Sequence, residues 1–512
     1  MSEKRNWGSK LIKLIKNPIS YCYVALVIML LLFTKQIFDA NGVGLFIPIA
    51  IGEVVISCLL IWILLIMQKK NKPIEKQFLL VALVLGALFI IILPPGQSPD
   101  EITHFRRAYG ISQGILVPDQ VVNDMGAIGS EIPKNTDFLE RSPDHGTYGM
   151  VIEETFSGND DLSTQSYTSA ALYNFICYIP QALAAFIGNL FGFSIMGMAY
   201  LMEIFDFAVW VLLIYFAIKI IPKFKSIVLF IALLPITLQE ATSISPDALT
   251  IGLCVFFISY VLYLAYGKRH LLDKKDYMVL IICSLLIGFC KIVYLPLILL
   301  LLIIPKEKFK SAKQRWLFIG ILFTVVAIIN MVWLMISSRY LIQYQEGVNS
   351  REQLMGIIKN PIRYIIVMFK TINVYGQTWL SNMLGMSLGA FRFNLPSVLF
   401  FVSFTIMILL FAQRNETLKL QRFDRWIFAI VFLMIAVLIL TSLYLQWTTC
   451  GADVIDGVQG RYFLPILLLP AVVFCRKDSL KKYPTLISNE FLLYYGLFVN
   501  MVALVTIFAQ NA

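Results

Sequence analysis

Two carboxylates, an imidazole and two guanidiniums lie close together in one polar stretch of the sequence, at Asp100, Glu101, His104, Arg106 and Arg107. On a helix, Asp100 and His104 are four residues apart and share one face. Carboxylates and imidazoles act as general bases, and arginine binds phosphate through paired hydrogen bonds. We therefore interpret Asp100, Glu101 and His104 as candidate catalytic residues, which would also bind a divalent metal such as Mg²⁺ or Mn²⁺ if one is used. Arg106 and Arg107 are candidate phosphate-binding residues.

The same stretch has a structural interpretation as the start of a short surface helix. Ser98 fits an N-cap, Pro99 fits the first helical position, and Glu101 closes a capping box. Acidic residues also suit the positive end of the helix dipole. Capping requires neither His104 nor the two arginines, so the cluster stays an active-site candidate.

A second group of polar residues lies near the C-terminal end, in the sequence Gly457-Val458-Gln459-Gly460-Arg461-Tyr462. An arginine at a membrane face suits recognition of phosphate or pyrophosphate. The structural alternative is an interfacial Arg-Tyr anchor after a turn. We expect Gln459, Arg461 and Tyr462 to contribute to substrate binding.

Two further candidates for substrate or phosphate binding are Asp247 and Lys291. Ser245-Pro246-Asp247 repeats the capping pattern ahead of an apolar run, so an N-cap is the alternative for Asp247. Lys291 either binds a lipid phosphate near the outer headgroups or extends its amine to the interface from within a helix.

Three carboxylates, Glu53, Glu203 and Asp206, fall inside apolar runs. Charged groups inside a bilayer are costly, so they indicate function unless they pack against other polar groups within the bundle. The pair Asp144-His145 is interpreted as a turn.

The elements that position these residues follow from composition. Hydrophobic residues make up 59% of the 512-residue chain and charged residues 14%, whereas soluble domains are about 45–50% apolar and about 25% charged. The apolar residues form runs of about twenty, long enough to cross a bilayer as helices. The chain is therefore predicted to be an all-α integral membrane protein, a polytopic helical bundle in contact with membrane lipids.

Basic residues fix the predicted orientation. The net charge of +11 comes from lysines and arginines in short links between apolar runs, as the positive-inside rule requires, and no nucleic-acid motif accompanies it. These links are residues 69–72, 268–275, 306–315, 414–425 and 476–482. With these links and an uncleaved N-terminus in the cytoplasm, a large first extracytoplasmic loop covers residues 94–166. Further outer segments cover residues 338–394 and 446–461, and we expect about thirteen transmembrane helices.

Three parts of this topology remain open. Basic links flank residues 277–304 on both sides, which favours a hairpin of two short crossings over one long helix. Two apolar runs, 171–190 and 194–221, lead from the outer loop to Lys223 and Lys225, so one run is expected to be re-entrant or interfacial. The amphipathic stretch 361–372 either lies flat at the interface or is a further span.

The motifs together resemble a known family. Pro99-Asp100-Glu101 with His104, Ser245-Pro246-Asp247, Lys291 with Tyr294, and Gly457 to Phe463 resemble, in order from about Phe78 to Phe474, the domain-of-unknown-function 2142 family of bacterial predicted membrane proteins. That family is similar in layout to the GT-C glycosyltransferases. The resemblance implies residues 77–512 as a GT-C-like membrane domain. Residues 1–76 would then be a basic N-terminus with two extra transmembrane helices.

The resemblance also implies a chemistry and a location. Asp100 or Glu101 would be the catalytic base or a metal-site carboxylate, and Arg106, Lys291 and Arg461 would bind the donor phosphate. The expected substrates are a polyprenyl-phosphate-linked sugar as donor and a cell-envelope glycan or glycolipid as acceptor. The expected location is the bacterial plasma membrane, with several passes and a cytoplasmic N-terminus.

Two other functions stay open at this stage. A transporter or flippase of lipid-linked saccharide would use Glu53, Glu203 and Asp206 within the membrane. A polysaccharide polymerase or ligase would depend on outer arginines such as Arg461 and would control chain length. The glycosyltransferase hypothesis depends instead on the outer loop.

Overall fold

The structure is a computed structural model of the whole chain. It describes residues 18–117, 120–121, 128–134, 136, 139, 144, 146–156, 162–268, 270–337, 347–412, 420–474 and 487–512. The predicted turn at His145, the basic link at 476–482 and much of the link at 414–425 lie outside these residues.

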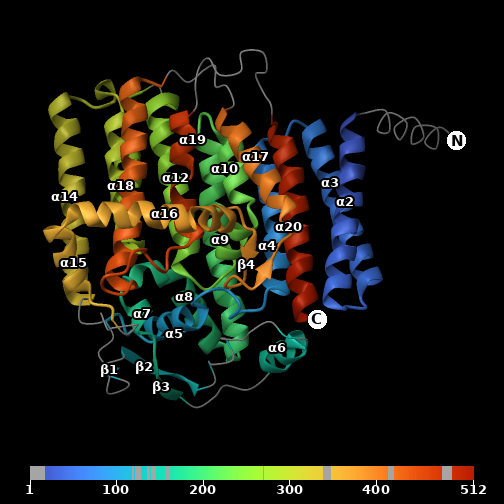
Figure 1. Cartoon of the computed structure of the whole chain (residues 1–512). Helices are drawn as coiled ribbons and strands as arrows, with labels where there is room; N and C mark the ends of the chain where they lie inside the picture. The colour runs from blue at the N-terminus through green and yellow to red at the C-terminus, as the bar shows by residue number, and fades with distance from the viewer. Residues whose placement is uncertain are drawn as a thin grey trace.

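Eight helices among the described residues are long and apolar enough to cross a membrane. They lie side by side in Figure 1 and are α2 (Pro18–Asn41), α3 (Phe46–Lys69), α4 (Ile74–Ile92), α9 (Ile195–Ile220), α12 (Pro246–Leu262), α14 (Ala312–Ser337), α18 (Arg422–Gln446) and α20 (Asn489–Asn511). The prediction of a polytopic helical membrane protein is confirmed.

The expected number of about thirteen spans is not confirmed, because several apolar runs are divided into shorter pieces. Three further apolar helices in the described part of the chain have only 10–17 residues: Phe175–Leu190, Ile292–Ile303 and Val398–Ala412. One run is broken where Leu234-Pro235 separates α10 (Lys225–Ala232) from α11 (Pro235–Ala241). Proline lacks the amide proton that a continuing helix needs.

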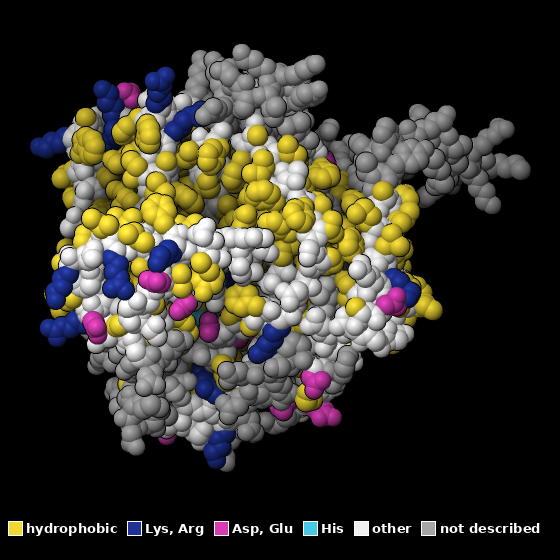
Figure 2. Space-filling model, in the orientation of Figure 1, with side chains coloured by type: hydrophobic (Ala, Val, Ile, Leu, Met, Phe, Trp, Pro, Cys, Tyr) yellow, Lys and Arg dark blue, Asp and Glu magenta, His cyan; other side chains and the backbone are white. Residues whose placement is uncertain are grey.

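The centre of the bundle is formed by α4, α9, α12 and α20. In the most apolar 18-residue stretch of each helix, 83% of the residues of the span that contains α12 and 89% of those of α20 are buried. The corresponding share in α2, α3 and α14 is only 22%. The peripheral helices therefore present large apolar side chains outward, such as Trp62 on α3 and Met335 on α14. Figure 2 shows a band of such side chains between two ends that carry the charged residues.

A hairpin covers residues 274–303, as predicted. The elements α13 (Lys274–Cys290) and η4 (Ile292–Ile303) pack together, and Lys291 lies between them in extended backbone. The amide of Leu272 donates to the carbonyl of Lys308 over 2.9 Å. The two flanking basic links therefore meet at one end of the bundle.

The two runs after the polar loop differ in length. The helix α8 (Ile179–Leu190) has 12 residues, or about 18 Å, which is short of the roughly 30 Å of a hydrocarbon core. The next helix, α9, has 26 residues, and the Nζ atom of Lys225 after it lies 3.6 Å from Glu75 at the start of α4. Lys225 thus lies at the same end as the basic link after α3, and α8 is the run that does not span.

The polar loop forms a small layer beneath the bundle at the opposite end (Figure 1). Its helices are α5 (Glu101–Ser112) and α6 (Thr147–Thr155), and the short helices α7 (Thr168–Ala171) and η2 (Phe175–Tyr178) follow directly after it. Its antiparallel sheet has the order β1 (Gln120–Val121), β2 (Ile128–Pro133) and β3 (Leu162–Ser166), with Gly129 opposite Ser166.

The segment predicted to lie outside, residues 338–394, contains an amphipathic helix, α16 (Pro361–Met383), which lies across the long helices in Figure 1. Ile362, Ile366 and Phe369 on it are exposed while Val367 and Thr371 are buried. The flat, interfacial alternative for residues 361–372 therefore agrees with the structure.

The remaining short elements complete the chain. They are η3 (Tyr263–Gly267), η5 (Lys306–Lys308), α15 (Ser350–Lys359), β4 (Ser387–Leu388), β5 (Phe393–Asn394), α17 (Val398–Ala412), η7 (Gly460–Ile466) and α19 (Leu468–Phe474).

Candidate functional site

Arg461, at the start of η7, is the centre of a buried charged cluster. Its Nη1 atom donates to both oxygens of Glu240, at 3.3 and 3.2 Å. Its Nη2 atom lies 3.4 Å from Asp100 Oδ2, and its Nε atom lies 4.0 Å from Asp247 Oδ2. A Cβ atom on the preceding Gly460 would lie 2.1 Å from the carbonyl oxygen of Trp379, so only glycine permits this approach of η7 to α16.

Lys291 supplies the second cation. Its Nζ atom lies 2.5 Å from Asp247 Oδ1 and also faces the rings of Tyr173 and Tyr462, at 5.8 and 5.1 Å from their centroids. Ser245 caps α12, since its hydroxyl accepts from the Asp247 amide, as the sequence predicts. The helix start thereby fixes Asp247 beside the two cations.

Asp100 is the most accessible member of the cluster, because 65% of its side chain is exposed, against 0% for Glu240, 11% for Asp247 and 7% for Arg461. It occupies the N-cap position of α5 with a left-handed backbone (φ 65°) and makes no side-chain cap bond. The prediction that Ser98 is the N-cap is therefore wrong, since the helix begins two residues later than a Ser98 cap requires.

Both carboxylate oxygens of Glu101 accept hydrogen bonds from backbone amides. Its carboxylate accepts hydrogen bonds from the amides of Gly96, Ser98 and Ile244, at 2.7 to 2.9 Å, and the residue is 2% exposed. The hydrogen bond from the Ser98 amide to Glu101 is the one that the predicted capping box assigns to the glutamate side chain. Burial raises the pKa of Glu101 to about 7 against the opposing effect of these bonds. Its geometry is that of an anchor between the loop and the turn before α12.

His104 lies one turn after Asp100 and is buried. Its Nδ1 atom is 2.7 Å from the Tyr178 hydroxyl, which leaves Nε2 for a ligand. Burial lowers the pKa of His104 to about 4, and the nearby Lys291 and Arg461 lower it further, whereas Asp100 and Asp247 oppose the shift. The imidazole is therefore neutral at pH 7.

Arg106 and Arg107 do not join this cluster. Arg106 donates to Thr136 Oγ1 and to the Ser166 carbonyl, and Arg107 donates to the carbonyls of Ile115 and Leu116. Arg107 is also completely buried. Both guanidiniums form hydrogen bonds within the loop, and their role in phosphate binding stays a prediction.

The charges of the cluster are nearly balanced. We use "ion cluster" for Asp100, Glu240, Asp247, Lys291 and Arg461, which carry three negative and two positive charges when ionised. Buried charges of this kind are stable only when they are paired and hydrogen-bonded. Each cation here has a carboxylate partner. Asp100 has the most exposed side chain of the cluster, and its hydrogen bond with Arg461 is the longest.

The predicted metal set of Asp100, Glu101 and His104 does not fit a metal ion. Glu101 directs its oxygens to three backbone amides, and His104 Nδ1 is engaged by Tyr178. No group of three His, Cys, Asp or Glu side chains able to hold a metal occurs in the described part of the chain. We therefore assign no chemical step to a metal.

The carboxylates of the apolar runs, Glu53, Glu203 and Asp206, are buried within the bundle. Glu53 accepts a hydrogen bond from Thr34 Oγ1 over 2.7 Å. This contact agrees with the alternative that Glu53 packs against another polar group within the bundle. Glu203 and Asp206 on α9 are each 1% exposed, and Asp206 lies within reach of the Gln181 side chain and the Ser245 backbone.

Sequence reasoning missed Glu240, Tyr173 and Tyr178. Glu240 lies in an apolar run, and that alone is a signal of function or of a buried ion pair. Nothing in the spacing of Tyr173 or Tyr178 marks them, because their contacts to Lys291 and His104 join distant segments.

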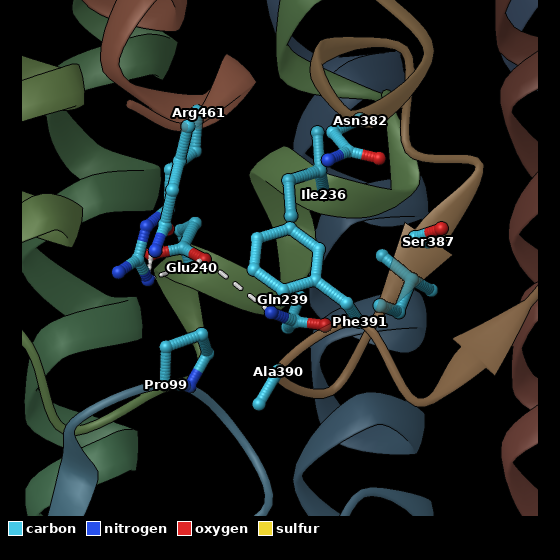
Figure 3. Close-up of a pocket in the computed structure, with 11 residues that line it drawn as sticks. Pro99, Ile236, Gln239, Glu240, Asn382, Ser387, Ala390, Phe391 and Arg461 are labelled. Carbon is cyan, nitrogen blue, oxygen red and sulfur yellow. Dashed lines mark hydrogen bonds and ion pairs between the residues drawn. The ribbon is translucent and has the colours of Figure 1, made fainter. Parts of the chain in front are cut away.

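A small pocket adjoins the ion cluster (Figure 3). It is lined by Pro99, Ile236, Gln239, Glu240, Asn382, Ser387, Leu388, Ala390, Phe391, Gln459 and Arg461. Of the predicted binding residues, Gln459 and Arg461 lie here, while Tyr462 faces Lys291 and Arg461 with its ring.

Comparison with known proteins gives one match. The family model described as "Predicted membrane protein (DUF2142)" matches residues 83–470. That range contains every member of the ion cluster and leaves α2, α3 and α20 outside. No curated protein and no solved structure matches the chain.

Proposed function

Since the chain belongs to the DUF2142 family of predicted membrane proteins, whose description states no activity, we propose its function from the ion cluster. We propose a glycosyltransferase that transfers a sugar from a polyprenyl-phosphate donor to a cell-envelope glycan or glycolipid. The observation that carries the proposal is the meeting of an accessible carboxylate, Asp100, with the buried cations Arg461 and Lys291 at the loop end of a membrane bundle. The GT-C-like layout is part of this proposal.

Donor binding begins with the phosphate of the lipid carrier. The contact of Arg461 Nη2 with Asp100 is 3.4 Å long, beyond the usual 2.7–3.2 Å of an N–H···O hydrogen bond. A phosphate group offers several oxygens to a guanidinium and, when it binds in bidentate fashion, takes the place of the single long contact to Asp100. Lys291 adds a second positive charge, held in place by Asp247 and two tyrosine rings.

Transfer then follows general-base chemistry. The displaced Asp100 carboxylate takes the proton of an acceptor hydroxyl, whose oxygen attacks the anomeric carbon of the donor sugar. The bond between that carbon and the phosphate oxygen breaks, and the polyprenyl phosphate leaves with the electron pair. Arg461 and Lys291 stabilise the charge that develops on this leaving group. Attack opposite the leaving group inverts the anomeric centre.

Two neighbours have positioning roles. Glu240 neutralises and orients Arg461 from a completely buried position. The neutral His104, oriented by Tyr178, presents Nε2 on the same helix face as Asp100 and accepts or donates a hydrogen bond to the acceptor hydroxyl.

The proposed orientation has the ion cluster at the outer face of a bacterial plasma membrane and the N-terminus in the cytoplasm. The basic links support it, because they meet at the end of the bundle away from the ion cluster. Labelling of Cys450 by a membrane-impermeant maleimide in intact cells tests this orientation. Labelling only after the cells are broken would contradict it.

The decisive test is Asp100→Asn. The change keeps the size of the side chain and removes the base, so transfer in proteoliposomes should fall by about 10²–10⁴-fold. The thermal unfolding midpoint should not change, because Asp100 is largely exposed. Asp453→Asn is the matched control, since Asp453 is 72% exposed and also pairs with a cation, Lys370. Unchanged transfer by the Asp100→Asn protein would refute the proposal.

A second candidate, a transporter of lipid-linked saccharide, is favoured by the burial of two carboxylates, Glu203 and Asp206, within the membrane-length helix α9. It predicts that Asp206→Asn and Glu203→Gln abolish translocation across proteoliposomes. The glycosyltransferase proposal predicts that both variants still transfer sugar. A polymerase or ligase is distinguished by altered polymer length in cells that carry Arg461→Gln.

A further inference from the structure

A cavity separate from the ion cluster lies at the corner where α15 meets α16. The helix α15 supplies Glu352, Gly356 and Lys359 to its lining, α16 supplies Arg363, and Tyr444 comes from the end of α18. The volume of the cavity is about 360 Å³, within the roughly 300–1,000 Å³ of sites for small molecules. The cavity therefore has room for a polar group of several atoms.

Two exposed cations, Lys359 and Arg363, lie on the lining where the two helices join. Arg363 Nη2 donates to the carbonyl of Gly451 over 3.0 Å, which holds the guanidinium against the cavity wall. A guanidinium has five N–H donors, so others stay available to a ligand. Within the described part of the chain, neither cation has a carboxylate partner. This arrangement favours an anionic ligand, and a phosphate above all, since arginine binds phosphate oxygens in pairs.

Glu352 is the acidic residue of the described lining, and it does not neutralise these cations. It precedes Lys359 by seven positions on α15, which is about 10 Å along a helix. It lies in the first turn of α15, where a carboxylate suits the positive end of the helix dipole. In α15 and α16 together, four basic residues accompany this one carboxylate: Arg351, Lys359, Arg363 and Lys370. The end of the cavity at the helix junction is therefore positive.

The helices around the cavity also carry apolar side chains on their outer surface. Met355 and Ile358 on α15 and Ile362 and Ile366 on α16 are exposed. Figure 2 shows charged side chains at the edge of the apolar band where Figure 1 places α15 and α16. Amphipathic helices at a membrane interface bind through their buried apolar area and through attraction to anionic lipids. A ligand that reaches the two cations can therefore have its apolar part in the bilayer.

We propose that this cavity binds the headgroup of an anionic phospholipid, with the phosphate between Lys359 and Arg363. The phosphate oxygens accept hydrogen bonds from the ammonium and the guanidinium. The acyl chains lie along the exposed apolar side chains of α15 and α16. The rings of Tyr364 and Tyr444, with centroids 5.0 Å apart, form part of the cavity wall. The site shares no residue with the ion cluster, so its occupancy does not depend on the proposed glycosyl transfer.

The test measures the affinity of the full chain in non-ionic detergent for three probes. They are short-chain phosphatidylglycerol, short-chain phosphatidylcholine and soluble glycerol phosphate. Phosphatidylglycerol should bind most tightly, because phosphatidylcholine has no net charge and glycerol phosphate has no acyl chains. Lys359→Gln and Arg363→Gln should each weaken the binding of phosphatidylglycerol by about fivefold, since each removes one cation from the phosphate.

Further variants separate charge from space. Lys359→Arg keeps the charge and should bind as the unmodified protein does. Arg351→Gln is the matched control for charge, since Arg351 is exposed on α15 outside the described lining. A Cβ atom at Gly356 would meet no atom within 4 Å, so Gly356→Leu should fill part of the cavity and weaken phosphatidylglycerol. Gly320→Leu on α14, where a Cβ atom also meets open space, is its control.

The unfolding midpoints of these variants without lipid should match that of the unmodified protein, because the altered positions are exposed. Equal affinity for phosphatidylglycerol and phosphatidylcholine would overturn the proposal. So would an equal loss of affinity in Arg351→Gln and Lys359→Gln, which would show unspecific attraction, or unchanged binding by Gly356→Leu. Glycerol phosphate that binds as tightly as the lipid would overturn the lipid assignment and identify a soluble phosphate compound as the ligand.

Discussion

Arg461 and Glu240 lie 221 positions apart in the sequence, yet a single guanidinium nitrogen, Nη1, donates to both oxygens of the Glu240 carboxylate. The two side chains are 7% and 0% exposed. This pair joins η7 to α11 next to Asp100 of the loop, and it fixes the cation to which we assign the donor phosphate. Removal of one member from such a pair leaves the other charge buried and uncompensated.

The pair predicts a specific pattern of stability. Glu240→Leu should destabilise the protein by about 3 kcal/mol or more, because the remaining contacts of Arg461, to Asp100 and Asp247, are longer. The double variant Glu240→Leu with Arg461→Met removes both charges and should recover part of that loss. Denaturant unfolding in detergent measures both. A double variant less stable than Glu240→Leu alone would contradict the prediction.

Arg107 is predicted to act in folding and not in phosphate binding. Arg107→Met removes the donors to the carbonyls of Ile115 and Leu116 inside the loop. We expect a loss of about 1–3 kcal/mol in unfolding free energy, with no change in affinity for polyprenyl phosphate. Lys370→Met is the matched control, since Lys370 is a half-exposed cation that pairs with Asp453. A selective loss of lipid affinity in Arg107→Met would restore the original assignment.

Much of the site was predictable because charge and hydrophobicity act locally. Asp100, Lys291 and Arg461 each interrupt or border an apolar run, and such interruptions indicate function in a membrane protein. The hairpin around Lys291 followed from two basic links that both favour one side. These inferences need only the order of polar and apolar residues.

The remaining details depend on which surfaces meet. The helical pattern does not specify that Glu101 turns inward to the Ile244 amide or that Arg107 points into its own loop. Glu240 shares an apolar run with residues that only pack, and its partner is 221 positions away. The expected number of about thirteen spans is not confirmed, because apolar composition does not show where a proline such as Pro235 divides a run.

Chelation is predicted to leave the proposed transfer unchanged. The oxygens of Glu101 are occupied by backbone amides, and Asp247 is occupied by Lys291. The side chains around the donor phosphate thus supply positive charge through Arg461 and Lys291. Transfer in proteoliposomes should be the same with EDTA as with added Mg²⁺ or Mn²⁺. A loss of activity in EDTA that Mg²⁺ or Mn²⁺ restores would show that a metal binds elsewhere on the path of the reaction.

The last prediction concerns the pH dependence of stability, on which two buried groups of α5 have opposite effects. The pKa of His104 is lowered from 6.5 to about 4 by burial. Between these values the unfolded chain binds more protons at His104, so this residue lowers stability as the pH falls from 6.5 to 4. The pKa of Glu101 is raised from 4.5 to about 7 by burial. Between those values the folded protein binds more protons at Glu101, so this residue lowers stability as the pH rises.

The two effects offset each other between pH 4.5 and 6.5, and His104→Gln should separate them. The variant keeps only the Glu101 effect, so its stability should fall by up to about 3 kcal/mol between pH 4.5 and 7 relative to the unmodified protein. His270→Gln is the matched control, because His270 is exposed. Unfolding midpoints in detergent across this range measure the difference. Parallel pH profiles for the unmodified and His104→Gln proteins would show that the pKa of His104 is not lowered in the folded protein, and would contradict the prediction.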